Sequence, residues 1–520
     1  MAHTTLASMV QRAFAAAHME MEKQKRNEKG IQPDRNISKS PVYPNMEEGQ
    51  YSNPKREMKN APRIIIVGAG LAGLTCAYRL KQAGILSTIY EATDRVGGRC
   101  WTRRGAFKEN QIVERGGELI NTGHMEIRNL AEEFNLKLDN LIEAETKGTE
   151  PLYYLKGSSY TLEEATKDFL EVYPQLQKDL EEVGETTLYN SFTERGFELD
   201  HMSIVDYINE IVPGGIHSKF GQLLVLAYTI EYGADADQQS ALNLLYLLGF
   251  SPKGSLNIFG DSDEQFHIRG GNDLLPELLA KELDGQIKFN AELMKIEQNS
   301  LGEIRLVFRN SESRWEVFAE KVVLTIPFRI LRLIDYEDAG FSSLKETAIE
   351  EIGVGVNTKL HAQFSNRFWR KLGTNGGTFS DTGYQNTWEV SRAQKGKSGI
   401  LVNYTGAGAA ANINALTEEQ LEEITESFFE QLKPVLPGSE KYWKGLSTVD
   451  HWLSNQWSRG SYSYFKVGQY TKFAGIAGER EGNIFFAGEH TSVAFQGYLN
   501  GAVETGERAS QEVLEDLKVK

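Results

Sequence analysis

The sequence predicts an α/β fold with a Rossmann-like nucleotide-binding domain, and residues 63–99 carry the observations behind that prediction. An apolar run at residues 63–67 has the pattern of a buried parallel strand and leads directly into Gly68-x-Gly70-x-x-Gly73. Apolar residues at helical spacing follow over residues 71–83, and a second apolar run, residues 87–90, ends on Glu91. This order of strand, glycines, helix, strand and acid indicates a dinucleotide-binding unit.

Each part of this unit has a physical reason. Gly68 makes a tight turn, Gly70 lets the backbone approach a pyrophosphate, and Gly73 lets the helix pack on the strand. The helix N-terminus offers free N–H groups and the positive end of its dipole to phosphates. Glu91, 18 positions after Gly73, is placed to accept hydrogen bonds from a ribose.

The composition of the chain excludes several classes of protein. A chain of 520 residues with 40% hydrophobic and 25% charged residues is typical of a globular protein with two or more domains. The net charge of −16 argues against a general nucleic-acid binder, and no apolar run is long enough for a transmembrane helix. The two cysteines, Cys76 and Cys100, allow no disulfide framework, and no histidine or cysteine spacing indicates a metal site.

The chain divides into six predicted segments. We expect residues 1–62 to form a helical arm and a proline-rich linker, and residues 136–264 and 346–450 to form a substrate domain with a helical insertion. Residues 63–135, 265–345 and 451–520 are expected to form the nucleotide-binding domain. The stretch 13–21 is too short and too interrupted for a signal-peptide core, so we expect a cytoplasmic protein, with secretion left open.

Glycine-rich sequences recur after the first unit. Residues 94–99 read DRVGGR, and residues 113–120 read as a strand-like run broken by Gly116-Gly117, whose alternative interpretation is a plain turn. Near the end, an apolar strand at residues 483–487 runs into Gly488-Glu489-His490-Thr491, and a helix follows to the C-terminus. The chain therefore holds a second glycine-marked strand-to-helix turn.

Together these motifs resemble the flavin-dependent amine oxidase superfamily of L-amino acid, monoamine and polyamine oxidases. They stand in the family's order and read as follows: GAGLAG at 68–73, YEATDRVGGR at 90–99, ERGGEL at 114–119, TIP at 325–327, GSYSYF at 460–465, FAGEHT at 486–491 and QGYLNGAVETGERA at 496–509. The resemblance implies a Rossmann-like FAD-binding domain, an α+β substrate-binding domain with a sheet over the flavin, and a helical insertion.

The resemblance also implies which residues hold the cofactor. By motif, residues 68–73 bind the pyrophosphate, Glu91 the adenosine ribose, Arg99 a phosphate, and Glu489 the second phosphate or the ribityl chain. Residues 116–119 run along the isoalloxazine, the Leu293 backbone holds the adenine end, and residues 497–502 face the pyrimidine edge of the flavin. The implied cofactor-binding set is Gly68, Gly70, Leu71, Ala72, Gly73, Glu91, Ala92, Arg99, Gly116, Gly117, Glu118, Leu119, Leu293, Gly488, Glu489, Gly497, Tyr498, Leu499 and Ala502.

One lysine and several aromatic residues are the implied reaction site. Lys359, in GVNTKLHAQF, matches the family's lysine that water bridges to flavin N5; the alternative is a surface lysine. Tyr462 and Tyr498 match the aromatic pair that flanks the substrate amine, and the alternative is ordinary core packing. The other implied substrate-binding residues are Glu118, Trp388, Trp457 and Gly497.

Two departures from the family pattern bear on function. Ser461 stands where monoamine oxidases have the cysteine that binds flavin covalently, so we expect non-covalent FAD. Leu119 stands where many L-amino acid oxidases have the arginine that grips the substrate carboxylate. Another cation would have to serve, and the candidates are Arg269, Arg392 and Arg459.

We expect oxidative deamination of an apolar or aromatic L-amino acid to a 2-oxo acid, ammonia and hydrogen peroxide. The resemblance implies hydride transfer from the α-carbon to flavin N5 and reoxidation by O2. The alternatives are a monoamine or polyamine oxidase that yields an aldehyde, and an amine dehydrogenase that uses another electron acceptor. We expect an amine or amino-acid substrate and O2 as partners, no nucleic acid or membrane, and a homodimer.

Overall fold

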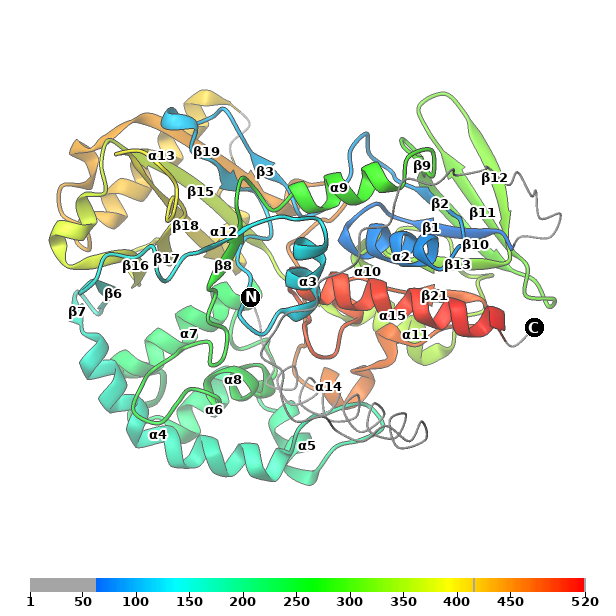
Figure 1. Ribbon diagram of the computed structural model, residues 1–520. Coiled ribbons are helices and arrows are strands. Elements are labelled where there is room, and N and C mark those ends of the chain that lie inside the picture. The colour runs from blue at the N-terminus through cyan, green and yellow to red at the C-terminus, as the bar shows by residue number, and fades with distance from the viewer. Residues whose placement is uncertain (1–61, 415–416, 519–520) are drawn as a thin grey trace, which may run out of the picture.

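The computed structural model describes residues 62–414 and 417–518. The predicted helical arm and linker therefore lie, except for Pro62, outside the described residues. Figure 1 shows two sheets side by side, one flanked by α2 and α15 and the other lying above a group of helices. The α/β class that the sequence predicts is confirmed.

The first sheet is parallel and begins at the strand that the sequence places before the glycines. Its five strands, in spatial order, are β21 (Ile484–Phe486), β13 (Lys321–Leu324), β1 (Ile64–Val67), β2 (Ser87–Tyr90) and β9 (Ile287–Lys288). All four residues of β1 are buried, as expected for a strand covered on both faces. Three stretches of chain far apart in sequence thus build one sheet, while the predicted segment boundaries stay predictions.

Two helices that cover this sheet pack closely against each other. Helix α2 (Leu71–Gln82) follows the glycine loop, and α15 (Leu499–Lys518) closes the chain beside it (Figure 1). A Cβ at Gly506 of α15 would lie 2.5 Å from the Ala72 carbonyl oxygen, so a glycine is required for this approach. The approach brings the N-terminal ends of both helices to the same cavity.

The second sheet is mixed and holds the predicted lysine. Its seven strands, in spatial order, are β19 (Trp443–His451), β15 (Asn357–Phe364), β18 (Gly399–Gly406), β17 (Asn386–Glu389), β16 (Thr374–Ser380), β6 (Glu150–Leu155) and β7 (Ser158–Tyr160). Only β16 and β6 run parallel within this sheet. Every residue of β15 is buried, and Lys359 lies between Tyr404 of β18 and Asp450 of β19.

The expected helical insertion is present below this sheet in Figure 1. Its helices are α4 (Leu162–Val183), α5 (Glu194–Asp200), α6 (Ile204–Ile211), α7 (Lys219–Tyr232) and α8 (Ala241–Leu248). Thr161 and Glu164 form a capping box at the start of α4. Helix α8 is buried around its whole circumference, which explains its unbroken run of apolar residues.

The remaining elements connect the two sheets or cover their outer faces. An antiparallel sheet of three strands follows β9, and the helix expected over residues 418–432 is present. These and the other elements are β10 (Glu292–Gln298), β11 (Ile304–Arg309), β12 (Arg314–Ala319), β3 (Thr102–Arg103), β4 (Val113–Glu114), β5 (Leu138–Asn140), β8 (Phe266–Ile268), β14 (Gly353–Val354), β20 (Ser463–Tyr464), α3 (Met125–Glu133), α9 (Leu274–Glu282), α10 (Phe328–Leu331), α11 (Ser343–Glu351), α12 (Ala407–Ala411), α13 (Glu418–Leu432) and α14 (Gln469–Phe473).

One expected strand is largely wrong. Within residues 113–120 only β4 is a strand, and the chain then leaves the sheet. A Cβ at Gly116 would lie 2.0 Å from the Arg99 carbonyl oxygen, and one at Gly117 would lie 2.5 Å from a Leu499 methyl group. The glycine pair therefore serves close packing rather than strand pairing.

A helix that crosses a bilayer needs about 20 predominantly apolar residues. No helix of the described residues, 62–414 and 417–518, is both long enough and apolar enough to span a membrane.

Candidate active site

A cavity of about 790 Å³ lies between the two sheets and receives residues from both. The predicted residues that line it are Gly68, Gly70, Leu71, Ala72, Glu91, Ala92, Arg99, Gly116, Gly117, Leu119, Leu293, Lys359, Trp388, Trp457, Tyr462, Gly488, Glu489, Gly497, Tyr498, Leu499 and Ala502. Two predicted residues, Gly73 and Glu118, are not part of this lining. The fold thus brings nearly all of the predicted set into one space.

The glycine loop forms one end of the cavity. Gly68 has a φ of +106°, and a Cβ there would lie 2.6 Å from the Thr325 hydroxyl oxygen. Gly73 stands beneath the loop, where a Cβ would lie 2.0 Å from the Gly68 carbonyl oxygen. Gly73 is therefore required for helix packing, which explains why it does not reach the cavity.

The N-terminal end of α2 is suited to binding an anion. Its N-cap, Gly70, has no side chain to cap the first N–H groups, and Leu71 and Ala72 line the cavity. Glu91 lies beside the loop, because its carboxylate accepts a hydrogen bond from the Ala69 N–H at 2.7 Å. A helix N-terminus with an acid at the end of the next strand fits the phosphate and ribose of a dinucleotide.

An ion pair joins the first glycine region to the C-terminal one. Arg99 donates to Glu489 Oε1 at 2.8 Å and to the Ser461 carbonyl oxygen at 2.7 Å. Glu489 also accepts from the Gly497 N–H at 2.9 Å. Burial alone would raise the pKa of Glu489, but the charge of Arg99 and the hydrogen bonds hold it below its usual value.

Lys359 is buried in the middle of β15 and has three partners on one loop. Its Nζ donates to Glu118 Oε2 at 2.6 Å, to the Gly116 carbonyl oxygen at 2.9 Å and to the Glu114 carbonyl oxygen at 3.3 Å. Burial would raise the pKa of Glu118, yet the adjacent lysine charge lowers it. The alternative of a surface lysine is excluded.

The carboxylate of Glu118, a residue expected to contact cofactor and substrate, accepts hydrogen bonds from Lys359 at 2.6 Å and from Trp388 Nε1 at 3.1 Å. Glu118 is not among the residues that line the cavity, whereas both of these neighbours are. Its direct contact with cofactor or substrate stays a prediction.

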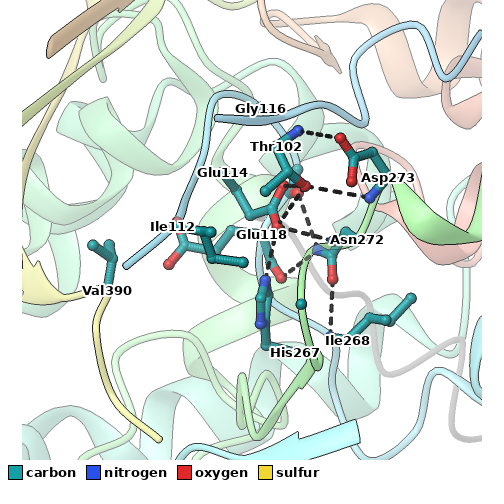
Figure 2. A network of polar contacts seen from close by, with 12 residues as sticks. Thr102, Ile112, Glu114, Gly116, Glu118, His267, Ile268, Asn272, Asp273 and Val390 are labelled. Carbon is teal, nitrogen blue, oxygen red and sulfur yellow. Dashed lines mark hydrogen bonds and ion pairs between the residues drawn. The ribbon is translucent and has the colours of Figure 1, made fainter. Parts of the chain in front are cut away.

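A polar network that the sequence analysis missed holds the loop carrying Glu118. Figure 2 shows the Glu114 carboxylate between Thr102, His267 and Asn272. His267 Nε2 lies 2.8 Å from Glu114 Oε1, and the Asn272 N–H donates to the same oxygen at 2.9 Å. The only sequence signal was the acid at the start of ERGGEL.

This network predicts that the stability of the folded protein depends on pH through His267. Burial would lower the pKa of His267, but the hydrogen bond to Glu114 and the charges of Glu114, Glu118 and Asp139 raise it. A raised pKa in the folded state means that the stabilisation is present below the ordinary value of about 6.5 and is lost as pH rises through the raised pKa.

We therefore expect His267→Gln to change the pH profile of thermal stability. As the pH rises from about 6.5 into the alkaline range, the wild-type Tm should fall more than that of the variant, since a hydrogen bond to a charged group contributes about 1.5–3 kcal/mol. Differential scanning calorimetry across this range tests the prediction. Parallel profiles for the two proteins would contradict it.

Aromatic residues surround the cavity next to Lys359. Tyr462 donates to the Glu231 carbonyl oxygen and lies 3.0 Å, oxygen to oxygen, from Tyr404, while the Tyr498 hydroxyl lies 3.2 Å from Ser262 Oγ. Burial raises the pKa of Tyr462 and Tyr498 well above 10, so both phenols stay neutral. Both residues line the cavity, and the hydroxyl group of each has a hydrogen-bond partner.

The three arginines considered as partners for a substrate carboxylate differ in their position and pairing. Arg269 pairs with Asp139 at 2.6 Å and does not line the cavity. Arg392 lines it but pairs with Glu145 at 2.7 Å. Arg459 also lines the cavity. Burial and the positive charge of Arg459 lower the pKa of Arg329, a residue of α10, so Arg459 lies near that helix.

Three carboxylates on the cavity wall were missed by the sequence analysis, and one of them, Glu292, pairs with Arg309. The other two are Glu231 and Glu264. Glu231 comes from the end of α7, and Glu264 from the loop before β8. Neither residue belongs to a recognisable motif. Each is a single acid in its stretch of sequence, and only the folded chain shows that it reaches the cavity.

Comparison with known proteins agrees with this geometry. A family model described as flavin containing amine oxidoreductase matches residues 71–514. The protein named "Putative L-amino-acid oxidase YobN" of Bacillus subtilis is 28% identical over 476 residues, covering 86% of this chain and 94% of its own. Amine oxidase [flavin-containing] B of Cavia porcellus is 26% identical over 474 residues, covering 87% and 86%.

A solved structure shows the same fold. Wild-type putrescine oxidase bound to putrescine aligns with a TM-score of 0.74 at 21% identity, covering 87% of this chain and 99% of its own. The glycine cradle, the uncapped α2 terminus and the aromatic chamber beside Lys359 fit a flavin nucleotide and an amine. The expected resemblance is confirmed: the chain belongs to the flavin containing amine oxidoreductase family.

Proposed function

We propose that this enzyme oxidises a primary amine with non-covalently bound FAD. The observation that favours an amine is the charge of the residues that line the cavity. Glu231 and Glu264 line it, Leu119 offers no charge, and Arg392 is already paired with Glu145. Arg459, the remaining candidate cation of the lining, lies toward α10. The negative charge of Glu231 and Glu264 would repel a substrate carboxylate, whereas it would not repel an amine.

The glycine loops and the flavin family together support FAD as the cofactor. Ser461 supports non-covalent binding, because a hydroxyl cannot form the thioether made by a cysteine, and its Oγ donates to Asn357 Oδ1 at 2.6 Å. Acid precipitation of the purified protein is expected to release all of the flavin into the supernatant as FAD. Flavin that stays with the precipitate would contradict this.

Bound flavin supplies the acceptor for a hydride from the carbon that bears the amine. The rings of Tyr462 and Tyr498 would orient a neutral amine and exclude water, and Lys359 Nζ, held by Glu118, would supply or accept protons beside the reacting atoms. The balanced reaction is RCH2NH2 + O2 + H2O → RCHO + NH3 + H2O2.

An L-amino acid is the second candidate, and Arg392 is the observation in its favour. Its guanidinium lines the cavity, so it could meet a substrate carboxylate if Glu145 were displaced. The relative from Bacillus subtilis carries an L-amino-acid oxidase name, which also favours this reading.

Peroxide release with phenethylamine and with L-phenylalanine separates the two candidates. We expect turnover of the amine and little turnover of the amino acid, because the two differ only in the carboxylate. Oxygen uptake measured with and without an artificial electron acceptor distinguishes an oxidase from a dehydrogenase. Turnover of L-phenylalanine alone would overturn the amine proposal.

A further inference from the structure

Beside Lys359 lies a group of buried polar side chains that the proposed reaction does not yet use. Lys359 and His361 are two positions apart on β15, so their side chains lie on the same face of the sheet. In the register of β15 and β19, Asp450 lies opposite Lys359, and Thr448 lies opposite His361. The two strands therefore place these four side chains next to one another on one face.

Several polar atoms of this group have no protein partner. His361 is 0% exposed, and neither of its ring nitrogens has a hydrogen-bond partner among the described residues. The same holds, within the described part of the chain, for Thr448 Oγ1, Asp450 Oδ2 and Arg103 Nε. The other oxygen of Asp450 is fully used, because it accepts from Arg103 Nη2 and Arg115 Nε at 2.6 Å each.

These atoms have the composition of an internal water site. The Arg103 Nε–H is a donor, Asp450 Oδ2 is an acceptor, and the Thr448 hydroxyl can be either. A buried polar or charged group without a hydrogen bond is costly, and ordered water commonly supplies the missing bond. Donors and acceptors from β3, β15 and β19 together give a water molecule the several polar partners that it needs.

His361 is suited to pass a proton through such water. Burial lowers the pKa of His361 well below its usual value, and the charges of Lys359 and Arg103 lower it further, so the ring is neutral. On β18 the residue opposite His361 is the uncharged Val402. A neutral imidazole has one donor and one acceptor nitrogen, so it can take up a proton at one nitrogen and release another from the second.

Amine oxidation moves protons at two stages. A substrate that binds in its protonated form must first lose a proton, RCH2NH3⁺ → RCH2NH2 + H⁺. The hydride that the neutral amine gives up later needs a proton to form peroxide, H⁻ + O2 + H⁺ → H2O2. Lys359 lines the cavity and shares a sheet face with His361, so it lies between the reacting atoms and the polar group.

We propose that His361, Thr448 and Asp450 hold internal water beside Lys359, and that His361 relays protons through this water between Lys359 and solvent. The proposal rests on the proposed amine oxidation and adds a proton route to it. Strand β19 is the edge strand of its sheet and Thr448 is partly exposed, so the outer end of the route lies there.

The proton balance closes over one turnover. When the substrate is deprotonated, a proton leaves Lys359 Nζ for the water, and Lys359 regains one from the cavity. One proton enters a ring nitrogen of His361, and another leaves from the second nitrogen toward solvent. Peroxide formation uses the same route in the opposite direction, which restores the starting tautomer of the ring.

The test measures flavin bleaching when the holoenzyme is mixed with phenethylamine without oxygen, from about pH 7 to about pH 10, the usual pKa of an alkylamine. His361→Gln can still bind water but lacks the second ring nitrogen. It is expected to slow bleaching at least about tenfold near neutral pH. The deficit should disappear toward pH 10, where the amine arrives neutral, whereas a purely structural defect would persist at every pH.

Two threonines on opposite faces of the sheet supply a milder variant and its control. Thr448→Val removes a hydroxyl of the proposed water site and should slow bleaching in the same pH range, and it decides the question if His361→Gln does not fold. Thr405 is 0% exposed, and its hydroxyl also has no partner among the described residues. It follows Tyr404, which lies opposite Lys359, so it lies on the other face. Thr405→Val is expected to bleach like the wild type.

The internal water also has a readout that is independent of turnover. A crystal structure of the holoenzyme is expected to show ordered water within hydrogen-bond distance of a His361 ring nitrogen and of Asp450 Oδ2. A dry site, or protein groups bonded to both of these atoms, would overturn the proposal.

The failures of the two proposals are distinguishable. If the amine does not bleach the wild-type flavin at any pH, the proposed function is wrong and the proton route falls with it. If the wild type is bleached and both His361→Gln and Thr448→Val keep its rate, amine oxidation stands and the relay is wrong. An equal deficit at neutral and at alkaline pH also shows that His361 is only structural.

Discussion

Replacing Lys359 by methionine is expected to lower kcat for amine oxidation by about 10²–10⁴-fold, the contribution of a positioned proton-transfer group. Lys359 is buried beside the cavity, and its Nζ has three acceptors on the loop that lines it. The variant loses that group while keeping a side chain of similar volume. Steady-state peroxide release, together with the flavin spectrum of the purified variant, measures the effect.

The ion pair with Glu118 complicates this variant and also supplies its control. Removing one partner of a buried pair leaves an uncompensated charge and costs about 3–5 kcal/mol of stability. The double variant Lys359→Met, Glu118→Gln removes both charges and should recover much of the lost Tm. We expect activity to stay low in the double variant, and recovery of activity with stability would show that Lys359 is only structural.

Replacing Gly73 by alanine is expected to give the second large effect, on cofactor retention. The added Cβ would lie 2.0 Å from the Gly68 carbonyl oxygen and 3.1 Å from the Thr325 hydroxyl, so the glycine loop or α2 must move. Overpacking of this kind costs about 1–3 kcal/mol, which corresponds to a flavin Kd raised about five- to 150-fold. Flavin content after purification and fluorescence titration of the apoprotein with FAD measure it.

Gly408 provides a matched control for that substitution. It lies in α12 at an exposed position, and a Cβ there would have no heavy atom within 4 Å. Gly408→Ala is expected to retain flavin fully and to be slightly more stable, because alanine lowers the entropy of the unfolded chain. Equal flavin retention by both variants would contradict the packing role assigned to Gly73.

The local sequence was sufficient to predict the first strands and helix of the nucleotide-binding half. Strand β1, α2 and β2 lie where the apolar runs and glycines predict them, because each signal depends on neighbours within a few residues. The strand error at residues 113–120 has the opposite cause. Gly116 and Gly117 are packed by Arg99 and Leu499, which no local pattern contains.

The motifs also identified most of the cavity wall, since a shared family order implies a shared arrangement. They did not show how the residues are paired. Lys359 and Glu118 are 241 positions apart, and Arg99 and Glu489 are 390 positions apart, yet each pair shares a short contact. The motif alone did not show that the Glu118 carboxylate accepts hydrogen bonds from Lys359 and Trp388.

The sequence by itself determined the dinucleotide loop, the flavin family and which lysine lines the cavity, because these depend on glycine spacing and motif order. Only the tertiary structure decided the charge of the chamber. Glu231, Glu264, Arg392 and Glu145 come from different elements, and none carries a signal of its own. Electrostatic character depends on which charges lie within a few ångströms of each other, and folding alone sets those distances.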